Sequence, residues 1–187
     1  MKMQKRIRLK NGADCLIRSA AAEDAEAVME LYRRTHEETD FLASYADEKS
    51  LELETERRFL HEAGQSAREA QLLAVMDGRI VGMAGIGAIG RGEKRAHRAQ
   101  FGISVLRDAW GRGIGRALTA ACIACAREAG FAQLELEAVA ENGAALALYR
   151  SFGFAEYGRN PRGFRSRFSG WQELVLMRLE LDEPEKT

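Results

Sequence analysis

The chain has 187 residues, 46% of them apolar, and its 28 basic side chains balance 28 acidic ones. This length predicts one domain with a substantial core, and zero net charge argues against a general nucleic-acid binder, which normally carries a basic excess. The neutral total hides two patches, since residues 23–62 hold thirteen acids against five bases and residues 91–116 hold seven bases against two acids.

The sequence predicts a cytoplasmic protein without a membrane partner. It contains no run of 18 apolar residues, and the basic segment 1–12 lacks the apolar stretch of a secretory signal. The cysteines Cys15, Cys122 and Cys125 are sparse and odd in number, which is typical of a reducing compartment. We expect a single domain over 1–187, with the N-terminal extension 1–12 and the acidic tail 182–187 flexible.

The first half of the chain predicts a strand, two helices and three further strands. In order, these are a strand at 14–18, a helix capped by Ser19 or Asp24 with Val28, Leu31 and Tyr32 on its apolar face, a helix at about 48–64, strands at 70–76 and 79–89, and a strand at about 95–105. In the second helix Leu51, Thr55 and Phe59 recur every four residues. Asp77-Gly78 joins two apolar runs, which is the strongest short-range signal for a hairpin.

The second half predicts two helices among three strands. In order, these are a helix at about 113–129 ended by Gly130, a strand at 132–139, a helix at about 143–152 capped by Asn142 with Ala145, Leu148, Tyr149 and Phe152 on its inner face, and strands near 154–159 and 171–181. The element order predicts an α/β (α+β) domain whose mixed, mostly antiparallel central sheet is flanked by about four helices.

Cys122 and Cys125 form a C-x-x-C pair on the apolar stripe of a predicted helix. No second pair of ligands follows, so we expect no metal site. Two interpretations stay open, namely small buried side chains, which we favour, and a redox site.

The stretch from Gln100 to Leu118 leads from a predicted strand through Gly111, Gly113 and Gly115 into a helix. Glycines let the backbone turn its N–H groups toward a ligand, and the start of a helix carries a partial positive charge. This stretch therefore predicts a phosphate-binding site, with Arg112 and Arg116 as candidate sources of full charge.

Three other interpretations of this loop are possible. A nucleoside-triphosphate P-loop needs Gly-Lys-Ser/Thr, which is absent, so it is rejected. A dinucleotide fold needs G-x-G-x-x-G close to its strand, whereas here the spacing is G-x-G-x-G after a gap at 106–110; Glu135 would be its ribose-binding acid. A purely structural glycine turn is the third alternative.

Two motifs in the chain resemble those of the GCN5-related N-acetyltransferases. The run VLRDAWGRGIGRAL at 105–118 resembles the family's pyrophosphate loop, V-x-P-x-x-R/Q-G-x-G-I-G-x-x-L, and NGAALALYRSFGF at 142–154 resembles its second signature, N-x-x-A-x-x-L-Y-x-x-x-G-F. The resemblance covers about 14–181. Two positions depart from the pattern, because Arg107 stands at the usual proline and Trp110 at the usual arginine or glutamine.

The resemblance implies acetyl-CoA as the acetyl donor and a strand at 101–105 that runs beside the pantetheine arm and splays from the next strand. A backbone N–H among Ile103 to Val105 would polarise the acetyl carbonyl. The cofactor-binding residues implied in this way are Ile103, Ser104, Val105, Trp110, Gly111, Arg112, Gly113, Ile114, Gly115, Arg116, Asn142, Ala145 and Tyr149.

The resemblance also implies roles in catalysis. Tyr149 matches a tyrosine that protonates the departing sulfur, although its helical spacing also suits a core aromatic. Glu137 lies where ribosomal-protein N-acetyltransferases of the family carry a catalytic glutamate, and the alternatives for the base are His97 and a water molecule. The leading prediction is direct acetyl transfer to a primary amine of a small molecule or of a peptide N-terminus.

The acceptor side is expected near the loop between the first two helices. The loop carries acids that could attract a cationic amine or be ordinary solvated charges, namely Glu37, Glu38, Asp40, Asp47 and Glu48. A catalytically silent acyl-CoA sensor of the same fold is the second hypothesis, and a nicotinamide-dependent oxidoreductase is the third. The acceptor, the length of the acyl chain and the oligomeric state stay open, with a homodimer as one expectation.

Overall fold

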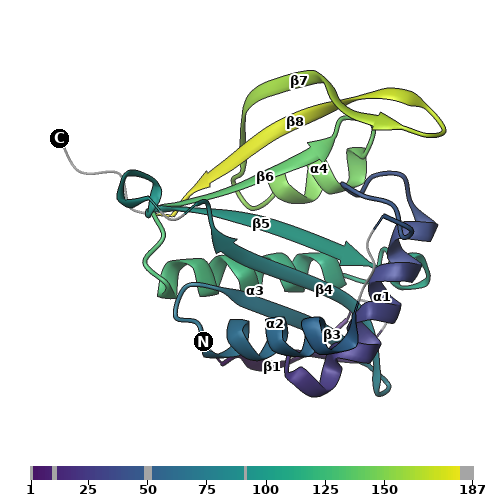
Figure 1. The fold of residues 1–187 in the computed structure, drawn as a ribbon, viewed down its shortest axis with the longest axis vertical. Coiled ribbons are helices and arrows are strands. Elements are labelled where there is room, and N and C mark those ends of the chain that lie inside the picture. The colour runs from purple at the N-terminus through teal and green to yellow at the C-terminus, as the bar shows by residue number, and fades with distance from the viewer. Residues whose placement is uncertain (1, 10–11, 49–51, 91, 182–187) are drawn as a thin grey trace.

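The fold is that of a computed structural model, which describes residues 2–9, 12–48, 52–90 and 92–181 (Figure 1). In this part of the chain, eight strands form one sheet in the order β1-β2-β3-β4-β5-β6-β8-β7. The strands are β1 (Gln4–Arg8), β2 (Asp14–Ser19), β3 (Ala70–Met76), β4 (Arg79–Ala88), β5 (Arg98–Val105), β6 (Gln133–Val139), β7 (Ala155–Ser166) and β8 (Gly170–Glu180). The helices are α1 (Ala25–Glu38), α2 (Leu53–Gln65), α3 (Ile114–Glu128) and α4 (Gly143–Arg150). The predicted mixed, mostly antiparallel sheet is confirmed.

One pair of strands decides where a ligand can enter the sheet. All neighbouring strands are antiparallel except β5 and β6, which run parallel and pair only from Arg98–Gln133 to Gln100–Glu135. Beyond Gln100 the two strands diverge, so the sheet opens into two arms (Figure 1). The prediction that the strand at 101–105 splays from its neighbour is confirmed.

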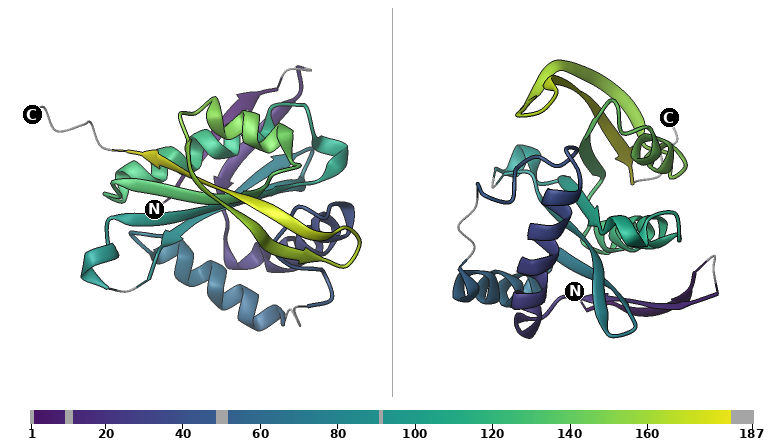
Figure 2. Two further views of the ribbon diagram at one scale, coloured as in Figure 1. Left: turned by 90° about the horizontal axis from the view of Figure 1, so that it is seen from above. Right: turned by 90° about the vertical axis from the view of Figure 1, so that its right-hand side faces the viewer.

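Helices cover both faces of the sheet, with α1 and α2 on one side and α3 on the other (Figure 2). Strand β3 is buried on both faces. Leu72 belongs to the core cluster that includes Leu118 of α3, whereas Leu73 packs in the cluster of Val28 and Leu60 from α1 and α2. A strand covered on both faces needs apolar side chains at consecutive positions, which accounts for the unbroken apolar run in this part of the sequence.

The cysteines of α3 belong to this core. Cys122 and Cys125 are free and buried, and burial raises the pKa of both thiols. Thiols held in the neutral form are poor nucleophiles and poor metal ligands, so the interpretation as small buried side chains holds. None of the described helices is long and apolar enough to cross a bilayer.

The N-terminal extension was predicted to be flexible, and for Gln4–Arg8 this prediction is wrong. These residues form β1, which pairs antiparallel with β2 from Gln4–Arg18 to Arg8–Asp14. The strand lies at the edge of the sheet and most of its side chains are exposed, so it shows no apolar alternation. Charged side chains are usual on edge strands because they discourage pairing with another chain. The tail at 182–187 lies outside the described residues.

The second helix begins later than predicted, at Leu53. Its expected stripe is wrong, because Thr55 and Phe59 are exposed, while Leu51 lies outside the described residues. The buried side chains are Leu60 and Ala63.

The strand predicted near 154–159 extends to Ser166. Its pairing with β8 is irregular between Asn160 and Phe164, around Pro161. Proline cannot donate a ladder hydrogen bond and is tolerated at edge strands and bulges. Pro161 therefore interrupts the strand pattern of the sequence, although β7 continues through it.

Candidate active site

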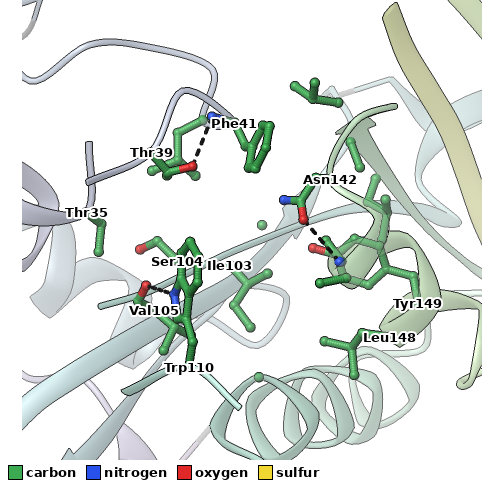
Figure 3. A pocket seen from close by; sticks show the side chains of 18 of the residues that line it. Thr35, Thr39, Phe41, Ile103, Ser104, Val105, Trp110, Asn142, Leu148 and Tyr149 are labelled. Carbon is green, nitrogen blue, oxygen red and sulfur yellow. Dashed lines mark hydrogen bonds between the residues drawn. The ribbon is translucent and has the colours of Figure 1, made fainter. Parts of the chain in front are cut away.

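A cavity of about 460 Å³ lies where β5 and β6 diverge. Its first end is lined by the glycine-rich loop before α3 and by α4, and its second end by α1, the loop that follows α1, and Phe164 of β7. Figure 3 shows Trp110, Asn142 and Tyr149, and also Thr35, Thr39 and Phe41, around the cavity. Of the thirteen residues predicted to contact the cofactor, all except Arg112 and Arg116 line this cavity. The structure therefore brings the two sequence motifs together across the gap in the sheet.

The glycine-rich loop has a backbone that favours glycine. Gly111 and Gly113 have φ angles of 72° and 98°, in the left-handed region, and α3 begins directly afterwards at Ile114. The first backbone bond of the helix runs from the Ala117 N–H to the Gly113 carbonyl, which leaves the N–H groups of the first turn without a helical partner. Since Ile114 and Gly115 line the cavity, these groups are available to an anion there.

The basic side chains around this loop are less available than the sequence indicated. Arg116 donates to Ser151 Oγ at 2.9 Å and stacks over Phe152, away from the cavity lining. Among the described residues, Arg112 makes no ion pair. Arg112 is therefore an arginine of this loop that no described acid engages, and it does not line the cavity.

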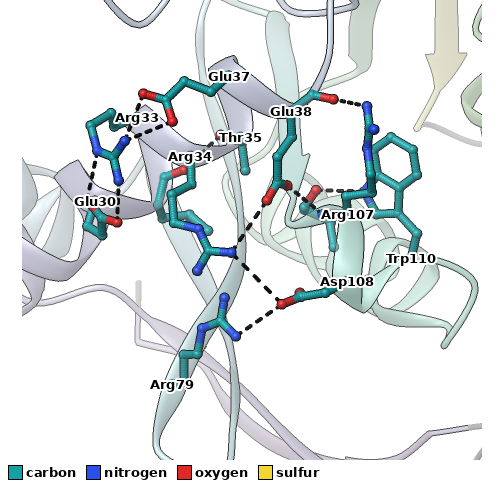
Figure 4. Close-up of polar contacts among 12 residues, drawn as sticks. Glu30, Arg33, Arg34, Thr35, Glu37, Glu38, Arg79, Arg107, Asp108 and Trp110 are labelled. Atoms are coloured by element: carbon teal, nitrogen blue, oxygen red, sulfur yellow. Dashed lines mark hydrogen bonds and ion pairs between the residues drawn. The ribbon is translucent and has the colours of Figure 1, made fainter.

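The two departures from the family pattern have structural reasons. The backbone N–H of Arg107 donates to Glu38 Oε2 at 2.7 Å, a bond that a proline could not make, and its guanidinium donates to the Glu38 carbonyl (Figure 4). The indole N–H of Trp110 donates to the Val105 carbonyl at 2.7 Å (Figure 3). Arg107 and Trp110 therefore tie the loop to the end of α1 and to β5.

Helix α4 supplies the opposite wall of the first end. Asn142 caps it, since its side-chain oxygen accepts the Ala145 N–H at 3.2 Å, as predicted. Tyr149 is 7% exposed and packs edge-on against Phe101, with ring centroids 6.0 Å apart. Burial raises the pKa of Tyr149 to about 12, so the phenol keeps its proton at neutral pH. No other described residue hydrogen-bonds its hydroxyl, and the side chain lines the cavity.

Of the candidate bases, only Glu137 lies at the cavity. It is an exposed residue of β6, two positions beyond the last residue that pairs with β5. His97 precedes β5 at the end of the strand remote from Ile103 to Val105, is exposed and does not line the cavity. The geometry therefore supports Glu137, alone or through water, and does not support His97.

Glu135 is not free to bind a ribose, as the dinucleotide interpretation requires. It is buried, and Arg98 holds it from the neighbouring strand by two hydrogen bonds, one of them from Nη2 to Oε2 at 2.7 Å. This contact holds the pKa of Glu135 below its usual range. The pair joins β5 and β6 within their last paired residues, directly before the strands diverge.

The acids expected to form a free acidic rim have partners within the protein. Glu37 pairs with Arg33 at 2.7 Å, and Glu38 contacts Arg34 and Arg107 (Figure 4). The other three bind residues of the β7–β8 hairpin, as the following contacts show: Asp40 with Ser166, Asp47 with Arg167, and Glu48 with Arg167. None of the five lines the cavity. The interpretation as a rim that attracts cations is therefore not supported.

The second end of the cavity has an apolar wall that sequence reasoning missed. Phe41 and Leu42 follow α1, and Phe164 comes from β7. The apolar pair after Thr39-Asp40 is visible in the sequence, but only the fold brings Phe164 to the same cavity. The described residues contain no group of His, Cys, Asp or Glu side chains that could hold a metal ion.

Comparisons with known proteins agree with this geometry. The profile of the acetyltransferase (GNAT) family matches residues 25–154. The L-amino acid N-acyltransferase MnaT of Escherichia coli (strain K12) is 27% identical over 89% of this chain and 94% of its own length.

Two solved structures share the fold over nearly their whole length. An acetyltransferase of the GNAT family from Streptococcus pneumoniae superposes with a TM-score of 0.84, at 28% identity over 90% of this chain and 99% of its own. A ribosomal-protein-alanine N-acetyltransferase from Brucella melitensis has a TM-score of 0.77, at 30% identity over 88% of this chain and 98% of its own.

Proposed function

The chain belongs to the acetyltransferase (GNAT) family and is an acetyl-CoA-dependent N-acetyltransferase, and from this premise we propose that its acceptor is the α-amino group of an amino acid or of a peptide N-terminus. Two relatives support this choice, since one is named for L-amino acids and the other for the alanine of a ribosomal protein. The single observation that supports acetyl transfer to an amine at this site is that Glu137 and Tyr149 line one cavity at the point where β5 and β6 diverge.

The residues of the first end would hold the donor. The backbone N–H groups at the start of α3, together with Arg112, bind the phosphates, and acetyl-CoA supplies the activated acetyl thioester. Strand β5 pairs with β4 along 99–105 but with β6 only up to Gln100, so its second edge offers backbone N–H groups to the thioester carbonyl. Such preorganised donors stabilise the negative charge that develops on that oxygen.

Proton transfer would fall to the two polar side chains of the cavity. Glu137 takes a proton from the acceptor ammonium, directly or through water, and the neutral amine then forms the N–C bond as the C–S bond breaks. Tyr149 donates its phenolic proton to the sulfur that leaves, and its raised pKa keeps this proton in place until that step. The second proton, which the nitrogen loses as it becomes the amide, restores the Tyr149 phenol directly or through water. No covalent enzyme intermediate is required, because the buried thiols of Cys122 and Cys125 lie on α3 and outside the cavity lining.

The test is release of the CoA thiol from acetyl-CoA with L-methionine, a peptide that begins with alanine, and spermidine. We expect turnover with at least one of the first two. Tyr149→Phe should lower kcat about 100-fold, the usual contribution of a general acid, and leave both KM values within about twofold. Tyr157→Phe is the matched control, because this tyrosine lies on β7, half-exposed and outside the cavity.

Three results would contradict the proposal. Full turnover by Tyr149→Phe across the pH range would remove the acid role. Binding of acetyl-CoA in a thermal-shift measurement, without thiol release for any amine, would favour the silent sensor. Stabilisation by NAD instead of acetyl-CoA would favour the oxidoreductase, and a ligand at 100 times its Kd stabilises by about 2.7 kcal/mol, which is readily detected.

The place of the enzyme is proposed to be the cytoplasm. All three cysteines are free and buried, which is usual in a reducing compartment. A homodimer stays a further expectation, which sedimentation of the purified protein would test.

A further inference from the structure

The loop after α1 is joined to the turn between β7 and β8, although more than a hundred residues separate them in the sequence. We call this set of contacts the clasp; its members are Asp40, Tyr45, Asp47, Ser166, Arg167 and Gln172. Figure 1 shows the loop beneath the tip of the hairpin. The clasp therefore connects the two arms of the sheet across the second end of the cavity.

Asp40 lies at the centre of the clasp. Its Oδ2 accepts a hydrogen bond from Ser166 Oγ at 2.6 Å and another from Gln172 Nε2 at 3.2 Å. Its Oδ1 accepts the Tyr45 hydroxyl at 3.2 Å, and its backbone carbonyl accepts Gln172 Nε2 at 3.1 Å. Gln172 is 6% exposed, so part of this network is shielded from water.

A second layer of contacts lies further out. The Arg167 N–H donates to the Tyr45 hydroxyl at 2.7 Å, and the guanidinium lies over the Tyr45 ring, 4.2 Å from its centroid. The same guanidinium binds Asp47 at 2.8 Å, where both side chains are largely exposed. Exposed ion pairs contribute little free energy, so we assign most of the stabilisation of the clasp to the partly buried hydrogen bonds of Asp40.

The residues next to the clasp are those that line the second end of the cavity. Phe41 and Leu42 directly follow Asp40, and Phe164 lies two positions before Ser166. A change in the distance between Asp40 and Ser166 must therefore move one apolar wall relative to the other. Among the described residues, no hydrogen bond or ion pair joins a clasp residue to the loop before α3 or to α4.

We propose that Asp40 is a positioning residue for acetyl transfer, because its hydrogen bonds to the β7–β8 hairpin fix the walls of the acceptor end of the cavity. The inference rests on the proposed function, since it concerns the acceptor of that same site. In this proposal Asp40 does not attract a cationic amine by its charge. It acts through its hydrogen bonds, which hold the two walls of the cavity in position. The affinity for the amine then depends on the fraction of molecules in which the clasp is closed.

The experiment compares Asp40→Asn with Glu37→Gln. Both remove one negative charge near the end of α1, but the ion-pair partner of Glu37 among the described residues is Arg33, on the solvent side of the helix. KM and kcat are measured for the amine of the panel with the highest turnover and for acetyl-CoA. We expect Asp40→Asn to raise the amine KM about tenfold, with the acetyl-CoA KM within about twofold, and Glu37→Gln to leave both within about twofold.

Ser166→Ala removes the shortest of the Asp40 contacts without changing any charge. It should raise the amine KM in the same direction, and the double variant should show less than the product of the two single effects. Backbone amide hydrogen exchange is measured on the same proteins. In Asp40→Asn the amides of 39–48 should exchange faster than in the wild-type protein, and those of α3 should exchange at the same rate.

The outcomes separate this inference from the proposed function. If no amine is acetylated by the wild-type protein, the proposed function fails, and hydrogen exchange of 39–48 alone then decides whether the clasp exists. If Glu37→Gln raises the amine KM as much as Asp40→Asn does, the effect is electrostatic and the inference is overturned. It is also overturned if Asp40→Asn raises the KM of acetyl-CoA to the same extent, or if exchange of 39–48 does not change.

Discussion

Arg107 and Arg112 stand on either side of Trp110, and their surroundings give them different roles. Arg107 is held by Glu38, through its backbone N–H and its guanidinium, and lies over the indole of Trp110. Arg112 is not engaged in this way within the described residues. The same residue type thus joins α1 to the loop in one case and leaves a positive charge beside the helix start in the other. A spacing in the sequence cannot distinguish these roles, because Glu38 is brought to Arg107 only by the fold.

Arg112→Ala should weaken donor binding. One charge-assisted hydrogen bond to a phosphate contributes about 1.5 kcal/mol, so we expect the acetyl-CoA KM to rise about tenfold while the amine KM stays constant. The KM of the wild-type protein should also rise with ionic strength, and that of Arg112→Ala should rise less. Thiol-release kinetics at low and high salt measure both effects.

Arg107→Ala is the control for this prediction. It should lower the melting temperature, since it loses its contact with the end of α1, but it should change the acetyl-CoA KM less than twofold. Equal increases of KM in the two variants would show that general positive potential matters and that Arg112 has no specific contact.

At the scale of elements, β5 and β6 are held together by few backbone hydrogen bonds, because the two strands diverge beyond Gln100. Their pairing covers only Arg98 to Gln100, and the Arg98–Glu135 pair lies within this short stretch. A partly buried carboxylate with two charge-assisted hydrogen bonds strengthens a connection that has few backbone bonds. We infer that this pair, which the dinucleotide interpretation would have assigned to a ribose, stabilises the opening of the sheet.

Glu135→Gln tests this role through pH. The contact with Arg98 lowers the pKa of Glu135 in the folded state, so its contribution is complete above the ordinary pKa of about 4.3 and is lost as the pH falls through the lower folded value. At pH 7 the variant should lose about 2 kcal/mol of unfolding free energy, and the difference should shrink below pH 4. Urea unfolding at several pH values measures it. Glu180→Gln, which breaks an exposed pair with Arg178, should change stability by less than about 0.5 kcal/mol.

The sequence located most elements, and the exceptions share a physical cause. Helices α3 and α4 begin and end close to their predicted limits because Gly113, Gly130 and Asn142 mark those limits locally. Strand β1 was missed because an exposed edge strand carries no apolar alternation. The continuation of β7 beyond Pro161 was missed because its partner β8 stabilises it, and that pairing is not encoded in the local pattern.

At the scale of the whole molecule, the segregated charges are explained by pairing between and within elements. The acids of 23–62 meet arginines of α1, of the loop before α3 and of the β7–β8 hairpin. The location of the cavity and most of its lining could be predicted from two motifs, since each motif is local. The clasp could not be predicted, because Asp40 and Ser166 are 126 positions apart and neither lies in a recognisable sequence motif.

This use of charge predicts how the protein responds to acid. Ion pairs lower the pKa of carboxylates in several parts of the fold, namely Asp24, Glu30, Asp47, Glu135 and Glu156. A carboxylate whose folded pKa is lowered stabilises the fold above its ordinary pKa of about 4 and ceases to do so as the pH falls through the folded value. We therefore expect these groups to cause no change in the melting temperature between about pH 6 and 7.5. Below about pH 4.5 the melting temperature should decline progressively.

The decline should depend mainly on the two least exposed of these carboxylates. The side chains of Asp24 and Glu135 are 15% and 8% exposed, whereas that of Glu30 is 54% exposed and its ion pair is screened by solvent. Thermal unfolding followed by circular dichroism between pH 3 and 7.5 should give a flatter acid limb for the double variant Asp24→Asn/Glu135→Gln than for the wild-type protein. Glu30→Gln/Glu156→Gln removes the same number of charges and should leave the limb nearly unchanged. If both double variants flatten it equally, total charge governs the response to acid and the partly buried pairs have no special part in it.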